Sequence, residues 1–354
     1  MLVTVNSSRR FDILTWVPAP VLTACFAALL FGAFLLLKGQ NPFVILWSIF
    51  QGAFLDGYGL KETLTRSTPL LFCALASAIP ARAGLFNIGA EGQLHAGAIA
   101  ATAVALHSGA LSSPTTITLM FVAAMIAGAL WGLVPAFLRA RWDVNEVLVT
   151  LMLNYVAIYL VQYLVSGPWK DPSASGWPYS AAFPDNAILP TWAESNVHIG
   201  LVFAVFAAFL FYFFLRKTTW GFAIRVIEAS PATAGYSGIN LSTYIIVLMA
   251  LGGALAAMAG VGEVSVIQGR LRPGISPGYG YTGFLISCLA RHNPMLILPV
   301  TLLIGGLYSG ADVLQLEADL PGATINIFMG MVFLSFLVSN YFQDRTNKRI
   351  ARKT

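Results

Sequence analysis

The chain alternates between long runs of apolar residues and short segments that carry charges and turn residues. A helix needs about 20 apolar residues to cross the hydrocarbon core of a bilayer. The runs are too continuous for the alternating strands of a β-barrel, and backbone polar groups in lipid must be satisfied within their own segment. The pattern therefore predicts an all-α, polytopic membrane helix bundle of about 10 spans. We place these spans at residues 18–37, 66–81, 90–107, 115–138, 144–165, 198–215, 241–262, 278–290, 294–316 and 322–341.

Some of these spans depend on how breaks and glycines are interpreted. No charged residue lies between Glu91 and Arg139, which is too long for one pass, so we divide this run at the turn residues 107–114. Segments 66–81 and 278–290 are short, and each is either a tilted helix or a broken helix that stops inside the protein. The pairs Gly128 with Gly132 and Gly306 with Gly310 have the spacing that lets two helices approach closely.

Composition and charge support a lipid-facing surface. Apolar residues make up 57% of the chain and charged residues only 10%, against about 25% charged residues in soluble domains. The net charge is +5, but a nucleic-acid partner is not expected, because the positive residues gather in short loops and at the C-terminus. With the N-terminus inside, 14 of the 20 lysines and arginines fall on inner segments and 6 on outer ones. The positive-inside rule therefore predicts an N-in, C-in protein of the cytoplasmic membrane.

This topology divides the chain into a cytoplasmic segment 1–17, a membrane domain 18–341 and a basic cytoplasmic tail 342–354. The inner loop 216–240 begins with basic residues and has the composition of a short amphipathic helix. It is either a docking point for another protein or a plain interfacial helix. The outer loop 166–197 is rich in proline and tryptophan, and it is either a lid on the outer face or a docking point for a partner.

Residues 84–97 read GLFNIGAEGQLHAG and are the most informative stretch. They place Asn87, Glu91, Gln93 and His95 between two apolar runs. Polar groups at membrane depth usually face a cavity or another helix, and glycine-broken backbone at that depth is tolerated where it lines a cavity. The segment is either a break near a permeation path or an ordinary inner loop followed by a helix start, with Glu91 favourable near the helix N-terminus.

The predicted span 144–165 carries a second polar set. Asn154 lies eight residues before Gln162, so the two amides fall near one face of a helix, and Tyr155 follows Asn154 directly. Such residues line a path or form hydrogen bonds between helices, and the second role is the more common.

The sequence lacks the motifs of several enzyme classes. It has no GxxxxGK[ST] phosphate loop, so we do not expect the chain to bind ATP by that route. HExxH and CxxC are absent, and no catalytic residue, metal ligand or cofactor is predicted on this chain. An intramembrane enzyme is therefore disfavoured. An ion-coupled secondary transporter of a small polar metabolite would need paired charges within its spans, where only Glu91, Glu146 and Glu263 stand out.

Three segments resemble one family. These are GLFNIGAEGQ, the inner loop TTWGFAIRVIEASPATAGYSGIN, and GYGYTGFLISCLARHNPMLILPVTLLIGGLYSGADVLQ. They are similar to the permease subunits of bacterial ABC importers for nucleosides and simple sugars, which are related to the branched-chain amino acid and ribose permeases. The resemblance extends from about residue 40 to residue 340.

The resemblance implies a heteromeric importer for a nucleoside or a related simple sugar. Cytoplasmic ABC ATPase subunits would bind ATP and Mg²⁺, a second permease chain, homologous or identical, would complete the path, and an extracytoplasmic binding protein or lipoprotein would deliver the substrate. The inner loop is similar to the coupling loop of such permeases, although Ser230-Pro231 departs from the strict motif. The resemblance places the ATPase contact at Gly221, Arg225, Glu228, Ala229, Ala234, Gly235 and Gly238, and the translocation path near Asn87, Glu91, Gln93, His95, Asn154 and Tyr155.

Overall fold

The computed structural model describes residues 19–174, 176–192, 195–317 and 319–351, and it is helical throughout apart from connecting segments and two isolated β-bridges. The predicted segment 1–17 and the last residues of the predicted tail lie outside the described residues. The chain divides into two compact units, residues 1–48 with 311–354 and residues 49–310. The helices are α1 (Ala19–Leu37), α2 (Pro42–Phe50), η2 (Gln51–Leu55), α3 (Gly57–Ala81), α4 (Ala90–Leu106), α5 (Ser113–Trp142), α6 (Glu146–Ser166), η3 (Asp185–Ala187), α7 (Gly200–Lys217), α8 (Thr219–Ala229), α9 (Pro231–Tyr236), α10 (Leu241–Gly262), η4 (Glu263–Ile267), α11 (Tyr279–Leu289), α12 (Pro294–Glu317) and α13 (Thr324–Ala351).

In the smaller unit, α1 packs along α13. The rings of Phe31 and Phe328 stack with their centroids 4.0 Å apart. The backbone of the predicted tail continues α13 as far as Ala351.

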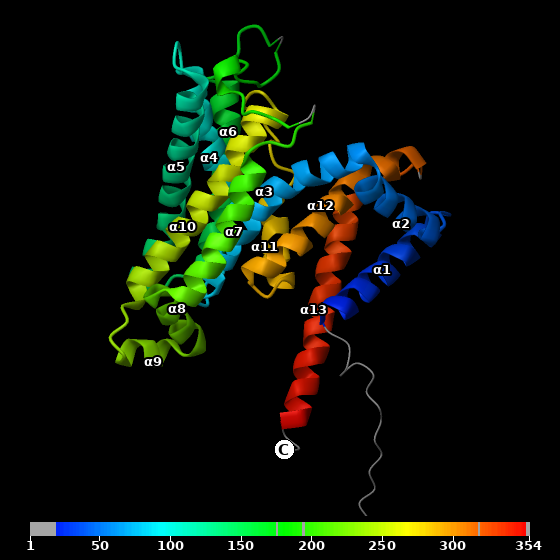
Figure 1. Ribbon diagram of the computed structural model, residues 1–354, viewed down its shortest axis with the longest axis vertical. Helices are drawn as coiled ribbons and strands as arrows, with labels where there is room; N and C mark the ends of the chain where they lie inside the picture. Colours follow the sequence, from blue (N-terminus) through cyan, green and yellow to red (C-terminus); the bar gives the residue numbers. More distant parts are fainter. Residues whose placement is uncertain (1–18, 175, 193–194, 318, 352–354) are drawn as a thin grey trace, which may run out of the picture. The chain divides into compact units, whose positions relative to one another are not determined.

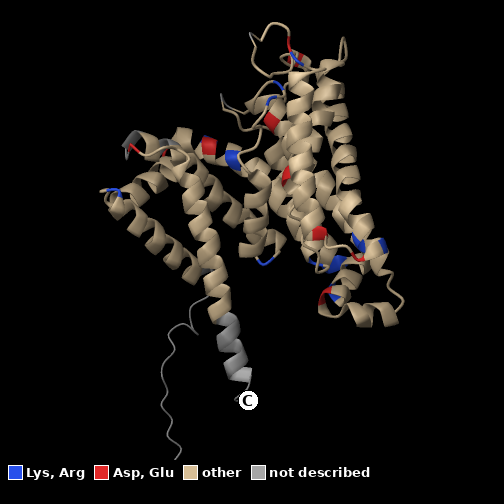
Figure 2. Ribbon diagram, turned by 180° about the vertical axis from the view of Figure 1, so that it is seen from behind, with Lys and Arg blue, Asp and Glu red and all other residues tan. Residues whose placement is uncertain are grey.

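The larger unit is a bundle in which α3, α4, α5 and α10 pack closely on one another (Figure 1). Figure 2 shows that its charged residues lie mostly at the two ends of the helices, with long uncharged stretches between them. Large apolar side chains such as Leu130, Phe206 and Leu210 are exposed along these stretches. This distribution is that of a surface whose middle faces lipid.

Among the described residues, six helices are long and apolar enough to span a membrane, or seven if the bent pair Val21–Leu37 and Pro42–Leu55 forms one span. Judged by length and apolar composition, the described helices therefore do not reach the predicted ten spans. Helix α3 carries Lys61, Glu62 and Arg66 in its first half, and α4 has only 17 residues.

The start of α3 differs from the predicted start, and the length of α11 bears on an alternative that the sequence left open. Helix α3 begins at Gly57, well before the predicted start at 66, because Asp56 caps it: the Gly59 N–H donates to Asp56 Oδ2 at 2.9 Å. Helix α11 has 11 residues, a rise of about 16 Å at 1.5 Å per residue, so it cannot cross the membrane alone. The sequence left open whether 278–290 is tilted or broken, and the short helix agrees with the second.

Glycines set how closely the helices approach. A Cβ on Gly128 would lie 2.2 Å from the carbonyl oxygen of Gly253, and one on Gly253 would lie 2.1 Å from that of Gly128. A Cβ on Gly132 would likewise lie 2.6 Å from the Met249 oxygen. The predicted packing role of the first glycine pair is therefore confirmed, with α10 as the partner of α5. The second pair approaches side chains, since Gly310 lies against Ile49.

We expect Gly253→Ala to lower the thermal unfolding midpoint of the purified protein by several degrees, because an added methyl group would force α5 and α10 apart. The matched control is Gly330→Ala, a helical position with no atom within 4 Å of the added Cβ. That substitution should leave the midpoint unchanged or raise it slightly. Equal midpoints for the two variants would show that the close contact does not limit stability.

The loops of the larger unit gather into two groups. At one end, Ser108 Oγ donates to Asn186 Oδ1 at 3.2 Å, and the Ser180 N–H donates to the Leu271 oxygen at 2.9 Å. These bonds join the loops around 107–112, 167–199 and 268–278. At the other end lie α8, α9 and the segments 82–89 and 290–293, and Figure 1 shows α8 and α9 far from the loop that joins α6 to α7.

Candidate translocation and coupling sites

The segment between α3 and α4 is held by the side chain of Asn87. Asn87 Nδ2 donates to the Ala76 oxygen at 3.2 Å and Asn87 Oδ1 accepts the Gly89 N–H at 3.0 Å. The amides of Asn87 and Gln93 also exchange two hydrogen bonds, of 3.1 and 3.3 Å. Both side chains are buried. They therefore fix a non-helical turn against the last turns of α3.

Asn154 joins α6 to the same segment. Its Oδ1 accepts the Gly92 N–H at 2.8 Å, and its Nδ2 donates to the Ile88 oxygen at 2.9 Å. The side chain thus supports the backbone at the start of α4 from a neighbouring helix. The adjacent Tyr155 lies on another face of α6 and is 50% exposed, so the structure does not bring it together with the buried set.

Glu91 joins α4 to the N-terminus of α11. Its side chain is 2% exposed, and its Oε2 accepts the Gly280 N–H at 2.7 Å. The first N–H groups of a helix have no partner within the helix and favour a negative charge. Ser276 Oγ accepts the N–H groups of Gly278 and Tyr279, completing the cap. His95, one turn along α4, places its Nδ1 2.7 Å from the Glu91 carbonyl oxygen.

The five buried residues Asn87, Glu91, Gln93, His95 and Asn154 therefore form one connected cluster. Their polar groups are used largely in bonds to backbone and to one another. This arrangement holds a broken helix in shape and leaves little of these side chains to contact a solute.

A second polar line, which the sequence did not single out, extends along α3, α11 and α12. Glu62 Oε1 accepts from Arg66 Nε at 2.6 Å, and an Arg66 NH group lies 3.4 Å from the Tyr279 hydroxyl. The Tyr279 ring centroid is 6.1 Å from that of Tyr308, whose hydroxyl lies 2.9 Å from Thr282 Oγ1. The predicted span 66–81 begins at Arg66 and leaves Lys61 and Glu62 outside. The spacing of Tyr58, Glu62 and Arg66 along one helix face was the available signal.

Two short helices form the predicted coupling loop. Thr218 caps α8, since its Oγ1 accepts the Gly221 N–H at 3.0 Å. Ser230 caps α9, since its Oγ accepts the Thr233 N–H at 3.2 Å, and Pro231 takes the first helical position. The departure Ser230-Pro231 from the strict family motif is therefore the signal that ends α8 and starts α9.

The predicted coupling residues are divided between support and surface. Gly221 and Ala234 are buried, and a Cβ on Gly221 would lie 2.3 Å from the Leu215 oxygen. The exposed members are Arg225, Glu228, Ala229, Gly235 and Gly238. Arg225 donates to the carbonyl oxygen of Leu215, which holds α8 on α7.

Two large aromatic side chains on this loop are exposed. Phe222 is 62% exposed and Tyr236 is 94% exposed. Aromatic residues are enriched at protein interfaces. Neither residue was predicted to contact the ATPase, because periodicity alone does not show which apolar positions of a short helix are buried.

An ion pair connects the coupling loop to the broken segment. An Arg82 NH group lies 3.3 Å from Glu228 Oε1, with both side chains partly exposed. Arg82 is the residue at which α3 ends, directly before the segment held by Asn87. The structure thus joins the two regions that the sequence predicted separately.

His292 lies beside this pair, in the loop between α11 and α12. Its Nδ1 lies 2.8 Å from Ser287 Oγ. Burial, with the positive charge of Arg82, lowers the pKa of His292 from 6.5 to about 4. The folded protein therefore holds this imidazole in its neutral form at neutral pH.

A pH dependence follows from the pKa of His292. Because the folded pKa lies below the unfolded value, protonation favours unfolding, and stability falls as the pH drops from 6.5 towards 4. We expect the wild-type protein to lose up to about 3 kcal/mol more than the His292→Gln variant over this window. Unfolding midpoints of the two proteins, measured in detergent across the window, check this. Parallel curves would contradict it.

Metal binding finds no support here. Among the residues that the structure describes, no three His, Cys, Asp or Glu side chains come together in a group that could hold a metal ion.

Comparisons with known proteins agree on one family. A model of the permease component of branched-chain amino acid transport systems matches residues 59–337. The chain is 36% identical to the glucose ABC transporter permease protein TsgB13 of Haloferax volcanii, over 92% of this chain and 88% of TsgB13. It is 31% identical to the guanosine ABC transporter permease protein NupP of Bacillus subtilis, over 83% and 85% of the two chains. It is 30% identical to the nucleoside ABC transporter permease protein NupB of Lactococcus lactis subsp. cremoris, over 82% and 83%.

Bacillus subtilis also has a second guanosine ABC transporter permease protein, NupQ. It is 25% identical to this chain, over 81% of this chain and 92% of NupQ. The chain is therefore more similar to one of these two permeases than to the other.

Proposed function

Because the chain belongs to the family of permease components of branched-chain amino acid transport systems, we propose that it forms half of the translocation path of an ABC importer for a nucleoside or a simple sugar. It is a multi-pass protein of the cytoplasmic membrane. The observation that carries the substrate class is the set of relatives named for glucose, guanosine and nucleosides. These solutes share a neutral ring that bears hydroxyl groups.

The energy source in this proposal is a separate cytoplasmic ATPase, with ATP and Mg²⁺ bound on that partner. An ion-coupled carrier would need acidic groups inside the membrane that are available to bind an ion. Glu91 is bonded to the Gly280 N–H, while Glu146 accepts the Phe86 N–H at 3.2 Å and lies 3.5 Å from Arg139 Nε. Two of the three acids that the sequence singled out are therefore already paired within the chain.

The ATPase contact in this proposal is the α8–α9 loop. Its support is the exposed pair Phe222 and Tyr236, which gives a partner an apolar contact beside the exposed Arg225, Glu228, Ala229, Gly235 and Gly238. Movement of α8 would then act on Arg82 through Glu228, and so on the segment between α3 and α4. Gly238 adds a backbone requirement, since its φ of +78° suits glycine.

The translocation path in this proposal passes near the broken segment. The buried side chains of Asn87, Glu91, Gln93, His95 and Asn154 hold its backbone in place, so they act on the path by position. Tyr155 is the predicted path residue with a half-exposed side chain that a solute could contact. A second permease chain, related as NupQ is to NupP, would supply the facing half of the path.

Ten spans with both termini inside fit the grouping of loops. The segments 82–89, 139–143, 216–240 and 291–293, which are predicted to lie inside, lie at the end that carries α8 and α9. The predicted outer loops around 107–112, 167–197 and 268–277 are bonded to one another at the other end. The binding protein would approach from the side of the loop 167–199.

The test of the substrate class is uptake by the assembled complex. The chain is expressed with its second permease, ATPase and binding protein in cells that lack other uptake systems for the same solutes. We expect uptake of radiolabelled guanosine or glucose that the other solute class does not compete away. Uptake of branched-chain amino acids without either of these would contradict the proposal.

A further inference from the structure

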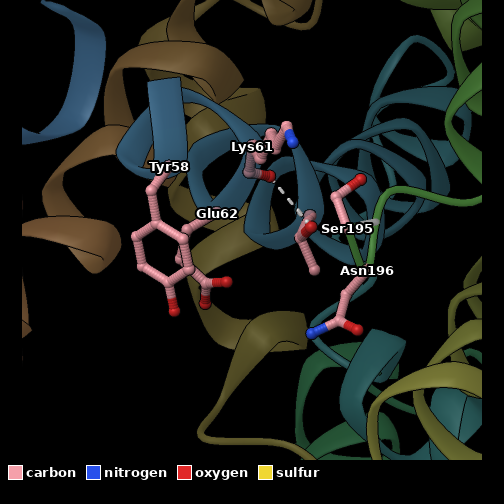
Figure 3. Close-up of a pocket in the computed structure, with 6 residues that line it drawn as sticks. Tyr58, Lys61, Glu62, Ser195 and Asn196 are labelled. Carbon is pink, nitrogen blue, oxygen red and sulfur yellow. Dashed lines mark hydrogen bonds between the residues drawn. The ribbon is translucent and has the colours of Figure 1, made fainter. Parts of the chain in front are cut away.

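A small pocket opens beside the first turns of α3. It has a volume of about 210 Å³ and is lined by Tyr58, Lys61, Glu62 and Thr65 of α3 and by Ser195 and Asn196 of the loop before α7 (Figure 3). The four α3 positions follow the spacing of one helix face. Pockets for drug-sized ligands are larger, about 300–1,000 Å³. This pocket is therefore suited to one small ring rather than to a whole extended ligand.

Every residue of the lining has a polar side-chain atom, and only some of these atoms make hydrogen bonds within the chain. Thr65 Oγ1 donates to the Lys61 oxygen at 2.9 Å, and Ser195 donates to the Trp192 oxygen. Within the described part of the chain, Asn196 and Tyr58 make no side-chain hydrogen bond. In Figure 3 the Asn196 amide points toward the side of the pocket where the Glu62 carboxylate and the Tyr58 hydroxyl lie.

Glu62 is held in place from behind. Arg66 Nε donates to its Oε1 at 2.6 Å, and the same guanidinium reaches the Tyr279 hydroxyl on α11. The carboxylate is thereby fixed in orientation, and its second oxygen remains as a strong acceptor. The arginine is engaged by these two groups.

A series of polar side chains connects the pocket with the interior of the bundle. From Arg66 the polar line continues through Tyr279 to Tyr308 and Thr282, and Gly280, next to Tyr279, binds Glu91. The buried cluster of the broken segment and the pocket are therefore two ends of one series of polar groups. The pocket end lies beside the loop 167–199.

We propose that this pocket is an outer subsite that binds the hydroxyl-bearing ring of the substrate before it enters the membrane. Vicinal hydroxyl groups donate to the Glu62 carboxylate and accept from the Asn196 amide, while the Tyr58 ring covers one side. A hexose and the ribose of a nucleoside share this chemistry. The inference rests on the proposed function and adds to it a place where this chain itself recognises the substrate.

The test is protection of a cysteine from a membrane-impermeant maleimide. Ser195→Cys, at a lining position whose hydroxyl bonds the Trp192 oxygen and is not assigned to the substrate, is introduced into a chain whose three native cysteines are replaced. The assembled complex is placed in vesicles without the binding protein. With guanosine or glucose at ten times the half-protecting concentration, labelling should slow about tenfold, since about a tenth of the sites remain free. The matched control is Thr191→Cys, an exposed position of the same loop outside the pocket, whose labelling should not change.

A second variant identifies the acceptor. Glu62→Gln in the Ser195→Cys chain should raise the half-protecting concentration by about tenfold, because a charge-assisted hydrogen bond becomes a neutral one. Protection by ribose 5-phosphate alone would overturn the assignment to a neutral ring. Protection by the binding protein without solute would make the surface a docking site instead.

Uptake measured in the same vesicles after the binding protein is added separates the two claims. Normal uptake of guanosine or glucose with no protection of the Ser195→Cys variant by any solute would overturn the subsite and leave the proposed function intact. Absence of uptake of both solutes by the complex that carries the unsubstituted chain would overturn both.

Discussion

Uptake by a complex that carries Glu91→Lys is expected to be abolished, with less assembled complex recovered from the membrane. Glu91 is 2% exposed, and its carboxylate receives the Gly280 N–H at the N-terminus of α11. A lysine there would set a cation against the positive end of a helix, with no acceptor for its own protons. An uncompensated buried charge costs about 3–5 kcal/mol. The effect should therefore reach both folding and transport.

The control for this variant is Glu91→Gln. The amide keeps an oxygen that can accept the Gly280 N–H and adds no positive charge. We expect this variant to assemble near the wild-type level, as measured by the amount of intact complex after detergent extraction. Normal assembly and uptake with Glu91→Lys would place the side chain in solvent and contradict the buried cap.

Charge reversal at Arg82 is expected to separate ATP hydrolysis from uptake. In Arg82→Glu two acids would face each other where the Arg82 and Glu228 side chains now lie 3.3 Å apart. Because both are partly exposed, the pair contributes only about 0–1 kcal/mol to stability, so the protein should still fold. The loss should appear in coupling: uptake falls by about 5- to 150-fold, the usual range for coupling between sites, while ATP hydrolysis by the complex continues.

The exchanged pair is the decisive variant. Arg82→Glu combined with Glu228→Arg should restore a large part of uptake, because the opposite charges meet again. Arg141→Glu, at an exposed position on the same end of the bundle, is the matched single reversal and should leave uptake close to normal. If the exchanged pair transports no better than Arg82→Glu, the ion pair does not transmit the movement of α8.

Much of the fold could be predicted because lipid imposes a simple rule on sequence. Long apolar runs located α5, α6, α7, α10 and α12 to within a few residues, while α13 continues to Ala351, well past its predicted end at 341. The start of α3 was missed because Lys61, Glu62 and Arg66 interrupt the apolar run. The helix nevertheless includes these three residues and begins after its cap, Asp56. Apolar patterning cannot distinguish a charged helix turn from a loop.

The site was less predictable because its bonds join residues far apart in the chain. The polar character of Asn87, Glu91 and Gln93 was evident from the sequence, but their partners on α3 and α11 were not. Asn154 was assigned either to a path or to bonds between helices, and its two bonds to the backbone at Ile88 and Gly92 are of the second kind. The Arg82–Glu228 pair had no local signal at all.

ATP-dependent uptake in proteoliposomes tests whether this chain works as the permease of an ABC importer. The purified complex of this chain, its second permease and its ATPase is reconstituted, with the binding protein outside and radiolabelled guanosine or glucose as the solute. We expect the solute to accumulate only when ATP and Mg²⁺ are enclosed on the ATPase side, and we expect no effect of a proton or sodium gradient. Accumulation driven by an ion gradient without ATP would contradict it and would return Glu91 and Glu146 to the position of ion-binding groups.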